Sequence, residues 1–452
     1  MKNTMKKIFA LGMTALVSVG MFAGCGGGKD NSAGADGKIE IKVSIGEENA
    51  EGELMSKWKQ AYEAKNDKVK IKISTFSGDY NETMMGYAQS PKQMPDIMWT
   101  TGETHAVWSK EGIFVNLKDM IDADASINLD DFYGEILSAT RTSSKDDGIY
   151  FMPRDYNKPV LFINKVMFKK AGFTDAEIAG LKDGWNYEKF LTTCEKLRAG
   201  LDKKEMPLDA KLDFNASYCS FIKHYGGEIV ENGKVNFLSN QNVNAYSEIY
   251  NLIDKGYIAD SSTKASTSFT YGMSAMMVGV RPQLPDIPAT SDYDIDFLSL
   301  PLEDVGVGCS GYAITSLASE RVSNSSYNAD GKSNEYYAFD FLKFIVSEEG
   351  QKIGAETGSI IPVRKSMAND TSWTSYMNAG LNHAAFISAP EKDFSLSMFQ
   401  DFTPDEAATI SESLAKTMAQ VLIRQNYANG TQELKNNIQQ FQNAVKDLKA
   451  QN

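Results

Sequence analysis

Side chains that could hold a small ligand stand at the ends of three predicted strands in the N-terminal part of the chain. They are two aromatic residues and two carboxylates: Trp99, Tyr80, Glu47 and Glu48. An aromatic ring can stack on the face of a ligand ring, and a carboxylate can accept hydrogen bonds from hydroxyl groups. A few polar groups of this kind set the specificity of a binding pocket. Trp99 could instead be a core residue, and Glu47 and Glu48 could cap the helix that follows them.

Motifs for catalysis are absent from the sequence. It contains no Gly-x-x-x-x-Gly-Lys-Ser/Thr loop, no Gly-x-Ser-x-Gly elbow and no His-Glu-x-x-His. His105, His224 and His383 do not have the spacing of metal ligands, and we expect neither a metal nor a cofactor. A glycoside hydrolase needs only two suitably placed carboxylates, and with 59 acidic residues the sequence leaves that alternative open.

Length and composition are those of a globular protein with large cores. The 452 residues suffice for two to three domains, with 42% hydrophobic and 23% charged residues. The formal net charge of −13 argues against nucleic acid as a partner, because phosphate binding needs clustered lysine and arginine. Cys194, Cys219 and Cys309 give no disulfide framework. Buried free thiols are favoured, and a Cys194–Cys219 bridge remains an open alternative.

The first 24 residues have the pattern of a secretory signal peptide. Three lysines precede the uncharged stretch 8–24, which ends in small residues directly before Cys25. This cysteine stands where a bacterial lipoprotein signal places the lipidated residue. Residues 25–37 are rich in glycine and polar side chains, so we expect a flexible tether. The alternative is an uncleaved anchor helix with an incidental cysteine.

The rest of the chain alternates between strand and helix patterns. Residues 39–45 and 69–73 alternate apolar and polar side chains, as half-buried strands do. The other predicted strands are 95–99, 148–153, 159–163, 275–279, 295–301 and 311–315, and the predicted helices are 51–65, 80–89, 186–199, 241–254, 336–346, 348–356, 405–424 and 431–449. This order predicts the α/β class with a parallel sheet, which binds ligands beyond the carboxyl ends of its strands.

Several short motifs follow one another in a specific order. Pro95-Asp96-Ile97-Met98-Trp99 is followed by Gly112-Ile113-Phe114-Val115-Asn116-Leu117. Further matching segments are 149–153, 162–172, 185–190, 269–276, 339–349 and 358–362. Together with the lipoprotein signal and the tether, the series resembles a family 1 extracellular solute-binding protein, the sugar-binding lipoprotein of an ABC importer. The resemblance covers nearly all of residues 38–445.

The resemblance implies a periplasmic-binding-protein-like fold of two α/β lobes, which are joined by hinge crossings and close on a ligand. Transfer of the family's segment order predicts lobe one at 38–153 plus 276–312 and lobe two at 154–275 plus 313–452. The polar run 154–157 then lies at the hinge and faces the cleft.

The resemblance also implies which side chains contact a sugar. Aromatic rings take the C–H faces of a sugar, and carboxylates, amides and arginine take its hydroxyls. Besides the four residues named first, the candidates are Asp155, Tyr156, Asn157, Arg281, Tyr312, Trp373 and Phe399. For the three hinge residues the alternative is a solvated loop, and for Trp373 and Phe399 it is a place in the core.

Arg281 departs from the family pattern, which has a small or aromatic residue near this position. A guanidinium suits a carboxylate or phosphate, so an acidic sugar is one hypothesis for the ligand. The favoured alternative is a contact with a hydroxyl group or an ion pair with a nearby aspartate.

The partners that the resemblance implies are a carbohydrate ligand, the permease subunits of an ABC importer, and a membrane reached through a lipid on Cys25. We expect a monomer at the cell surface or in the periplasm, without enzymatic activity. The sequence leaves two alternatives open, a surface glycoside hydrolase and a binder of a non-sugar solute such as a glycerophosphodiester or a polyamine.

Overall fold

The computed structural model describes most of the chain after residue 35. The described residues are 36–46, 49–78, 80–212, 214–231, 234–237, 239–258, 268–377, 380–397, 400–402, 406, 409 and 410. The strands are β1 (Ile39–Gly46), β2 (Val69–Phe76), β3 (Ile97–Thr101), β4 (Met152–Pro153), β5 (Val160–Asn164), β6 (Met206–Asp209), β7 (Val230–Glu231), β8 (Lys234–Val235), β9 (Ser274–Gly279), β10 (Ile295–Ser299), β11 (Val305–Val307), β12 (Ser310–Ile314) and β13 (Asp393–Ser395).

The helices are mostly short and lie against the sheets. The α-helices are α1 (Asn49–Lys65), α2 (Tyr80–Gln89), α3 (His105–Lys110), α4 (Lys118–Asp122), α5 (Gly134–Ser138), α6 (Lys165–Lys170), α7 (Asp175–Ala179), α8 (Tyr187–Gly200), α9 (Asn215–His224), α10 (Asn240–Asp254), α11 (Ser316–Glu320), α12 (Asn334–Val346), α13 (Glu348–Ala355) and α14 (Thr371–Thr374). Short 3-10 helices are η2 (Pro91–Gln93), η3 (Leu129–Asp131), η4 (Gly180–Lys182), η6 (Phe269–Tyr271), η7 (Arg281–Asp286), η8 (Lys365–Met367), η9 (His383–Ile387) and η10 (Pro390–Lys392).

Most of the predicted elements are confirmed within one or two residues. The predicted strand 148–153 is wrong in its first part, since only β4 remains. The backbone of Ile149 and Tyr150 pairs with Leu117 and Thr140, which lie in loops and not in a strand. The predicted helices 405–424 and 431–449 lie almost wholly outside the described residues.

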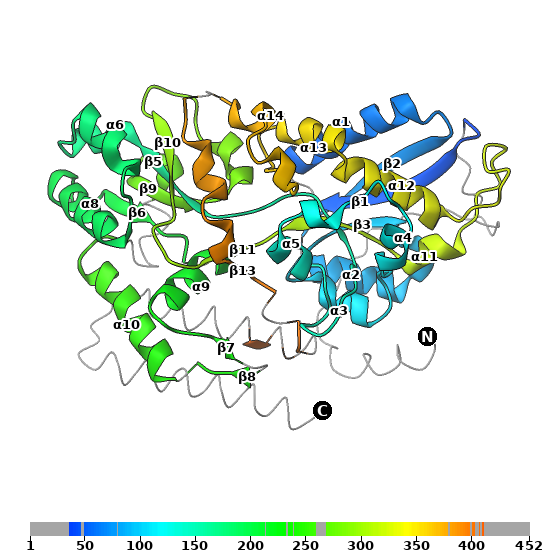
Figure 1. The fold of residues 1–452 in the computed structure, drawn as a ribbon, viewed down its shortest axis with the longest axis horizontal. Coiled ribbons are helices and arrows are strands. Elements are labelled where there is room, and N and C mark those ends of the chain that lie inside the picture. The colour runs from blue at the N-terminus through cyan, green and yellow to red at the C-terminus, as the bar shows by residue number, and fades with distance from the viewer. Residues whose placement is uncertain are drawn as a thin grey trace, which may run out of the picture. The chain divides into compact units, whose positions relative to one another are not determined.

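The first sheet has the strand order β2-β1-β3-β12-β4. β1 runs parallel to β2 and β3, as the alternating strand and helix patterns predicted, whereas β12 is antiparallel to β3 and β4. The apolar side chains of β1, at Ile39, Ile41, Val43 and Ile45, are fully buried. Helices α1, α12 and α13 contact one another on one side of this sheet (Figure 1).

The second sheet has the strand order β10-β5-β9-β6. β5 is antiparallel to both β9 and β10, and β6 is parallel to β9. All residues of β5 and β9 are buried, which explains their continuous apolar sequences. α8 contacts β6, and α9 contacts α10 and the separate strand β11, which pairs with β13 (Figure 1).

Two parts of the chain belong to other sheets than the predicted boundaries imply. β9 and β10, expected in lobe one with 276–312, pair with β5, because the chain crosses back to the first sheet only at β12. Helices α11–α13, expected in lobe two with 313–452, lie on the first sheet. Arg321 holds this region through its ion pair with Asp96, the buried aspartate of the Pro-Asp motif, at 2.8 Å.

Three connections between the sheets run side by side. Asn157 and Gly308 form a backbone bridge, and the amide of Arg154 donates to the carbonyl of Ser310 at 2.9 Å. The amide of Tyr156 donates to the carbonyl of Ile361 at 3.0 Å. The connection at residues 154–157, where the sequence predicts a hinge, therefore contacts two other segments that are far from it in sequence.

The described cysteines, Cys194, Cys219 and Cys309, are free and buried, so the Cys194–Cys219 bridge does not form. Within the described ranges, no helix combines the length and the apolar character that a membrane span requires.

Candidate functional site

The ends of both sheets that adjoin the connections carry the candidate site. Thr101 at the end of β3 pairs with Ser310 at the start of β12, directly after a connection. In the second sheet, Val160 at the start of β5 pairs with Gly279 and Ser299 at the ends of β9 and β10. The carboxyl ends of β1–β3 and of β6, β9 and β10 are therefore next to the connecting segments, where ligands of such sheets bind.

Three aromatic rings form a cluster at the carboxyl ends of β2 and β3. The ring centroids of Phe76, Tyr80 and Trp99 are 5.9 to 6.3 Å apart, in edge-on and tilted arrangements. All three side chains are only partly buried. The Trp99 Nε1–H is shielded from solvent but has no hydrogen-bond partner among the described residues. Because such a group costs free energy when it is left unpaired, this indole is suited to donate to a ligand.

Hydroxyl groups hold this aromatic cluster in place. The Tyr80 hydroxyl donates to Thr100 Oγ1 at 3.0 Å, and the hydroxyls of Thr100 and Thr101 lie 3.3 and 3.0 Å from that of Thr104. Burial raises the pKa of Tyr80, so its hydroxyl keeps its proton at neutral pH. The structure thus brings Tyr80 and Trp99 together, as the sequence placed both at strand ends.

Glu103 lies in the same loop as Thr104 and reaches towards the second sheet. Its carboxyl hydrogen-bonds with the side chain of Asn215, the first residue of α9. Desolvation by the surrounding protein raises the pKa of the Glu103 carboxyl, and the hydrogen bond with Asn215 opposes that rise. Sequence reasoning missed both residues, although Glu103 follows Trp99 by four positions and Asn215 follows β6 by six.

Lys211 presents a positive charge just beyond the carboxyl end of β6. Its ammonium pairs with Asp209 at 2.8 Å. Its φ of 48° lies in the left-handed region, which is uncommon for lysine and marks local backbone strain. The sequence contains no signal for this conformation, so Lys211 was not among the predicted site residues.

The three predicted hinge residues have different environments. The Asp155 carboxylate accepts from the amide and the hydroxyl of Ser310 at 2.8 and 3.0 Å, and the Tyr156 hydroxyl donates to Asp393. Both side chains are 1% exposed, so the prediction that they face a cleft is wrong. Asn157 is half-buried, and its Oδ1 has no hydrogen-bond partner in the part of the chain that the structure describes, which leaves it able to accept from a ligand.

Tyr312 is also part of the interior. Its side chain is fully buried, and its hydroxyl donates to Glu51, which in turn pairs with Arg154. The prediction that Tyr312 reaches the cleft is wrong, because its hydroxyl fixes the start of α1 to the connection that contains Arg154.

Arg281 and Trp373 form a closed cage. Arg281 is fully buried and donates to the carbonyls of Gly358 and Trp373 at 2.9 and 2.8 Å, and its third contact is His383 Nδ1 at 2.8 Å. Its guanidinium lies 5.4 to 5.8 Å from the ring centroids of Trp373, Tyr376 and Phe386. Burial lowers its pKa to about 10.

This cage corrects two predictions. Arg281 is fully buried, and within the described ranges its hydrogen bonds go to two carbonyl groups and a histidine and none goes to an aspartate. Trp373 is fully buried, and its Nε1–H donates to the carbonyl of Met367 at 3.1 Å. The hypothesis of an acidic sugar therefore loses the residue on which it depended. Cys25, Glu47, Glu48 and Phe399 lie outside the described residues.

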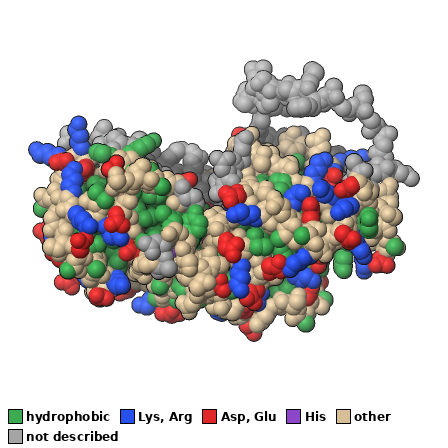
Figure 2. Space-filling model, turned by 90° about the horizontal axis from the view of Figure 1, so that it is seen from above, with side chains coloured by type: hydrophobic (Ala, Val, Ile, Leu, Met, Phe, Trp, Pro, Cys, Tyr) green, Lys and Arg blue, Asp and Glu red, His purple; other side chains and the backbone are tan. Residues whose placement is uncertain are grey.

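Charged side chains of both signs are interspersed on the face seen in Figure 2, with hydrophobic side chains between them. In the described part of the chain, no group of three or more His, Cys, Asp or Glu side chains could hold a metal ion. The site thus offers aromatic faces, hydroxyls, a carboxyl, an amide and one lysine.

Comparison with known proteins assigns this architecture. The model of a family described as bacterial extracellular solute-binding protein matches residues 57–380. No curated protein sequence gives a match.

Solved structures resemble the fold over almost their whole length. The ABC substrate-binding protein Lmo0181 from Listeria monocytogenes, in complex with cycloalternan, is 16% identical with a TM-score of 0.71 and covers 91% of this chain and 99% of its own. UgpB from Mycobacterium tuberculosis, in complex with glycerophosphocholine, is 16% identical with a TM-score of 0.72, and the match covers 91% of this chain and 99% of UgpB. The GacH receptor of Streptomyces glaucescens is 19% identical with a TM-score of 0.68, and the match covers 90% of this chain and 98% of the receptor. At such identities the likeness shows the two-lobed fold alone.

Proposed function

This chain belongs to the bacterial extracellular solute-binding proteins, the binding components of ABC transporters, and we propose that it captures a neutral sugar or oligosaccharide between its two lobes. The observation that supports this proposal is the aromatic cluster of Phe76, Tyr80 and Trp99 at the carboxyl ends of β2 and β3. A partly exposed ring with an unpaired N–H can stack on a sugar face and donate to a hydroxyl.

Residues from both sheets would complete the site. Glu103 and Asn157 Oδ1 would accept hydrogen bonds from sugar hydroxyls, and Asn215 could both donate and accept. Lys211 would act as a donor at the side of the second sheet. Closure of the lobes would exchange the contact between Glu103 and Asn215 for contacts with the ligand, with bending at the three connections.

Delivery to a membrane permease and attachment to a membrane complete the proposal. A lipid on Cys25, the tether 25–37 and loss of residues 1–24 would keep a monomeric binder near the permease and raise its effective concentration there. More than one acyl chain is needed for stable anchoring. Labelling cells with a palmitate analogue tests this part, because a Cys25→Ser variant should carry no label and should be released from the membrane fraction.

A panel of neutral glycans, measured by thermal shift on the protein without residues 1–36, tests the central part. We expect one or more glycans to raise the midpoint of unfolding, and Trp99→Ala to abolish that rise while the glycan stays intact. Appearance of cleaved products would favour the glycoside hydrolase. A rise with glycerophosphodiesters or polyamines only would favour a non-sugar solute, and either outcome contradicts the proposal.

A further inference from the structure

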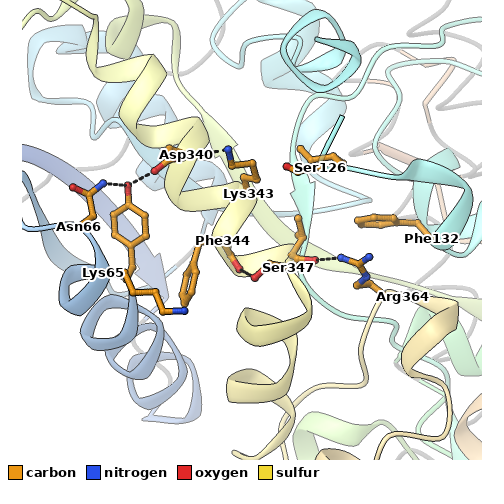
Figure 3. Close-up of a pocket in the computed structure, with 12 residues that line it drawn as sticks. Lys65, Asn66, Ser126, Phe132, Asp340, Lys343, Phe344, Ser347 and Arg364 are labelled. Carbon is orange, nitrogen blue, oxygen red and sulfur yellow. Dashed lines mark hydrogen bonds and ion pairs between the residues drawn. The ribbon is translucent and has the colours of Figure 1, made fainter. Parts of the chain in front are cut away.

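A second concave site lies on the first-sheet half, away from the aromatic cluster. It is a pocket of about 380 Å³ between the C-terminal part of α1, the helix α12 and the loop 126–132, with Arg364 at one end (Figure 3). Its size is near the small end of ligand pockets, which hold roughly 300–1,000 Å³, so it fits a ligand of one or two rings.

The apolar part of this pocket offers a ring face. Phe344 on α12 is partly buried, and its ring lies 5.7 Å from that of Tyr62 on α1. Phe132 closes the opposite wall and is 2% exposed. Phe344 is therefore the ring that a ligand could reach in this pocket.

The three positively charged side chains that line the pocket form ion pairs with carboxylates that lie outside it. Lys65 pairs with Glu349, Lys343 with Asp124 at 3.0 Å, and Arg364 with Asp131 at 2.8 Å; none of these three carboxylates lines the pocket. Among the described residues, Asp340 is the one carboxylate that lines the pocket. It accepts from the Tyr62 hydroxyl at 2.8 Å and lies 3.3 Å from the Lys343 ammonium.

This arrangement excludes several ligand classes. The cations and the Asp340 carboxylate are already paired, so neither an anion nor a cation would find a free counter-charge in this pocket. A hydrocarbon would cover these charged groups without giving them hydrogen bonds, which costs free energy. What fits is a neutral ring that has one apolar face and hydroxyls able both to donate to Asp340 and to accept from the cations.

We propose that this pocket is an accessory site for a neutral sugar, distinct from the site between the lobes. The choice of a sugar as the probe rests on the proposed function, but the pocket itself does not depend on the cleft. A weak second site of this kind would hold a further part of a long glycan, or a second molecule, on the surface of the first lobe.

Binding of glucose, xylose, maltose and cellobiose to the Trp99→Ala protein tests the proposal, because this variant removes the proposed cleft site. We expect saturation-transfer signals from at least one of these sugars, and electron density for it beside Phe344 in soaked crystals. Glucuronate and glucosamine should bind more weakly than glucose. A Phe344→Ala change should raise the dissociation constant about tenfold or more, which corresponds to about 1.4 kcal/mol.

Two further variants separate loss of binding from loss of folding. Ser126 is exposed at the rim, so Ser126→Phe should fill the pocket and abolish binding without removing a core side chain. Tyr336→Ala removes an exposed aromatic ring elsewhere on α12, 52% exposed, and should leave binding unchanged. If none of the four sugars binds, if glucuronate binds as well as glucose, or if binding survives Ser126→Phe, the accessory site is overturned. Failure of the cleft proposal would instead appear in the thermal-shift panel, where the Trp99→Ala protein would show the same glycan-dependent rise in unfolding temperature as the unchanged protein.

Discussion

Two aromatic clusters differ in how their polar atoms are satisfied. One lies at the carboxyl ends of β2 and β3, and the other surrounds Arg281, which follows β9. In the first, Phe76, Tyr80 and Trp99 are partly exposed, and the Trp99 N–H has no hydrogen-bond partner within the described structure. In the second, the guanidinium of Arg281 and the indole of Trp373 are fully buried, and their donors reach carbonyls or a histidine.

The difference shows that residue type and strand-end position do not separate a binding site from a structural cage. Both clusters combine rings with strong donors, and the sequence suggested ligand contacts for both. What separates them is the presence of acceptors from distant segments. A cluster that has all its partners stabilises the fold, and one with a spare donor and an exposed ring can hold a ligand.

The largest expected effect is on stability, in the cage. Arg281→Ala would leave the carbonyls of Gly358 and Trp373 without donors and open a cavity among three rings, so we expect a loss of about 3 kcal/mol or more in the free energy of unfolding. Urea unfolding followed by circular dichroism measures it. Arg141→Ala, at a partly exposed arginine that forms no ion pair with the described residues, is the matched control and should cost well under 1 kcal/mol. Equal losses for the two variants would show that the cage has no special role.

The next largest effect is a pH dependence of the free energy of unfolding, caused by a buried histidine next to the first cluster. His105 follows Thr104 but is fully buried, with its Nε2 donating to the carbonyl of Ala139 at 2.9 Å. Burial lowers its pKa to about 3. The unfolded chain, with an ordinary histidine pKa near 6.5, therefore binds a proton at higher pH than the folded protein does.

Stability should fall as the pH drops below about 6.5, by about 2 kcal/mol from this residue at pH 5, and this contribution should level off below pH 3. Unfolding curves at pH 7 and pH 5 measure the change, and His105→Gln should remove that part of it. An identical pH dependence in the variant would mean that His105 does not carry the effect.

The next effect compares one substitution in both clusters. Trp99→Phe keeps a ring but removes the unpaired N–H, so affinity for a glycan found in the panel should fall about tenfold, or about 1.4 kcal/mol, with little change in stability. Trp373→Phe removes the bond to Met367, so stability should fall by about 1 kcal/mol while affinity stays the same. Calorimetric titration and urea unfolding of both variants provide the four values. Loss of affinity in Trp373→Phe alone would reverse the assignment of the clusters.

The smallest effect is expected for Tyr80→Phe. This change removes only the hydroxyl that donates to Thr100, so the ring should stay in the cluster with looser positioning. We expect affinity to fall about threefold, corresponding to about 0.6 kcal/mol. A loss as large as that of Trp99→Ala would mean that the Tyr80 hydroxyl itself contacts the ligand.

The sequence predicts much of the local structure and little of the site. Apolar alternation in 39–45 is a local feature and is confirmed, since Ile39, Ile41, Val43 and Ile45 of β1 are buried. The allocation of β9 and β10 to a sheet depends on pairing with β5, more than 100 residues earlier, and was predicted wrongly.

The prediction of the site residues was wrong for a similar reason. No local pattern shows that the partners of Arg281 are Gly358, Trp373 and His383, between 77 and 102 positions away. The positive φ of Lys211 likewise follows from its tertiary surroundings. Trp99 could be proposed because its role depends on its position at a strand end, which the sequence does contain.

The most direct test follows the indole N–H groups of the five tryptophans by ¹H–¹⁵N NMR during titration with a glycan that raises the unfolding temperature. The resonance missing from the Trp99→Phe protein identifies Trp99, and that missing from Trp373→Phe identifies Trp373. We predict that the Trp99 resonance moves strongly and saturates with the glycan while the Trp373 resonance stays in place. A stationary Trp99 resonance, with or without a shift of Trp373, would contradict the assignment of the ligand to the first cluster.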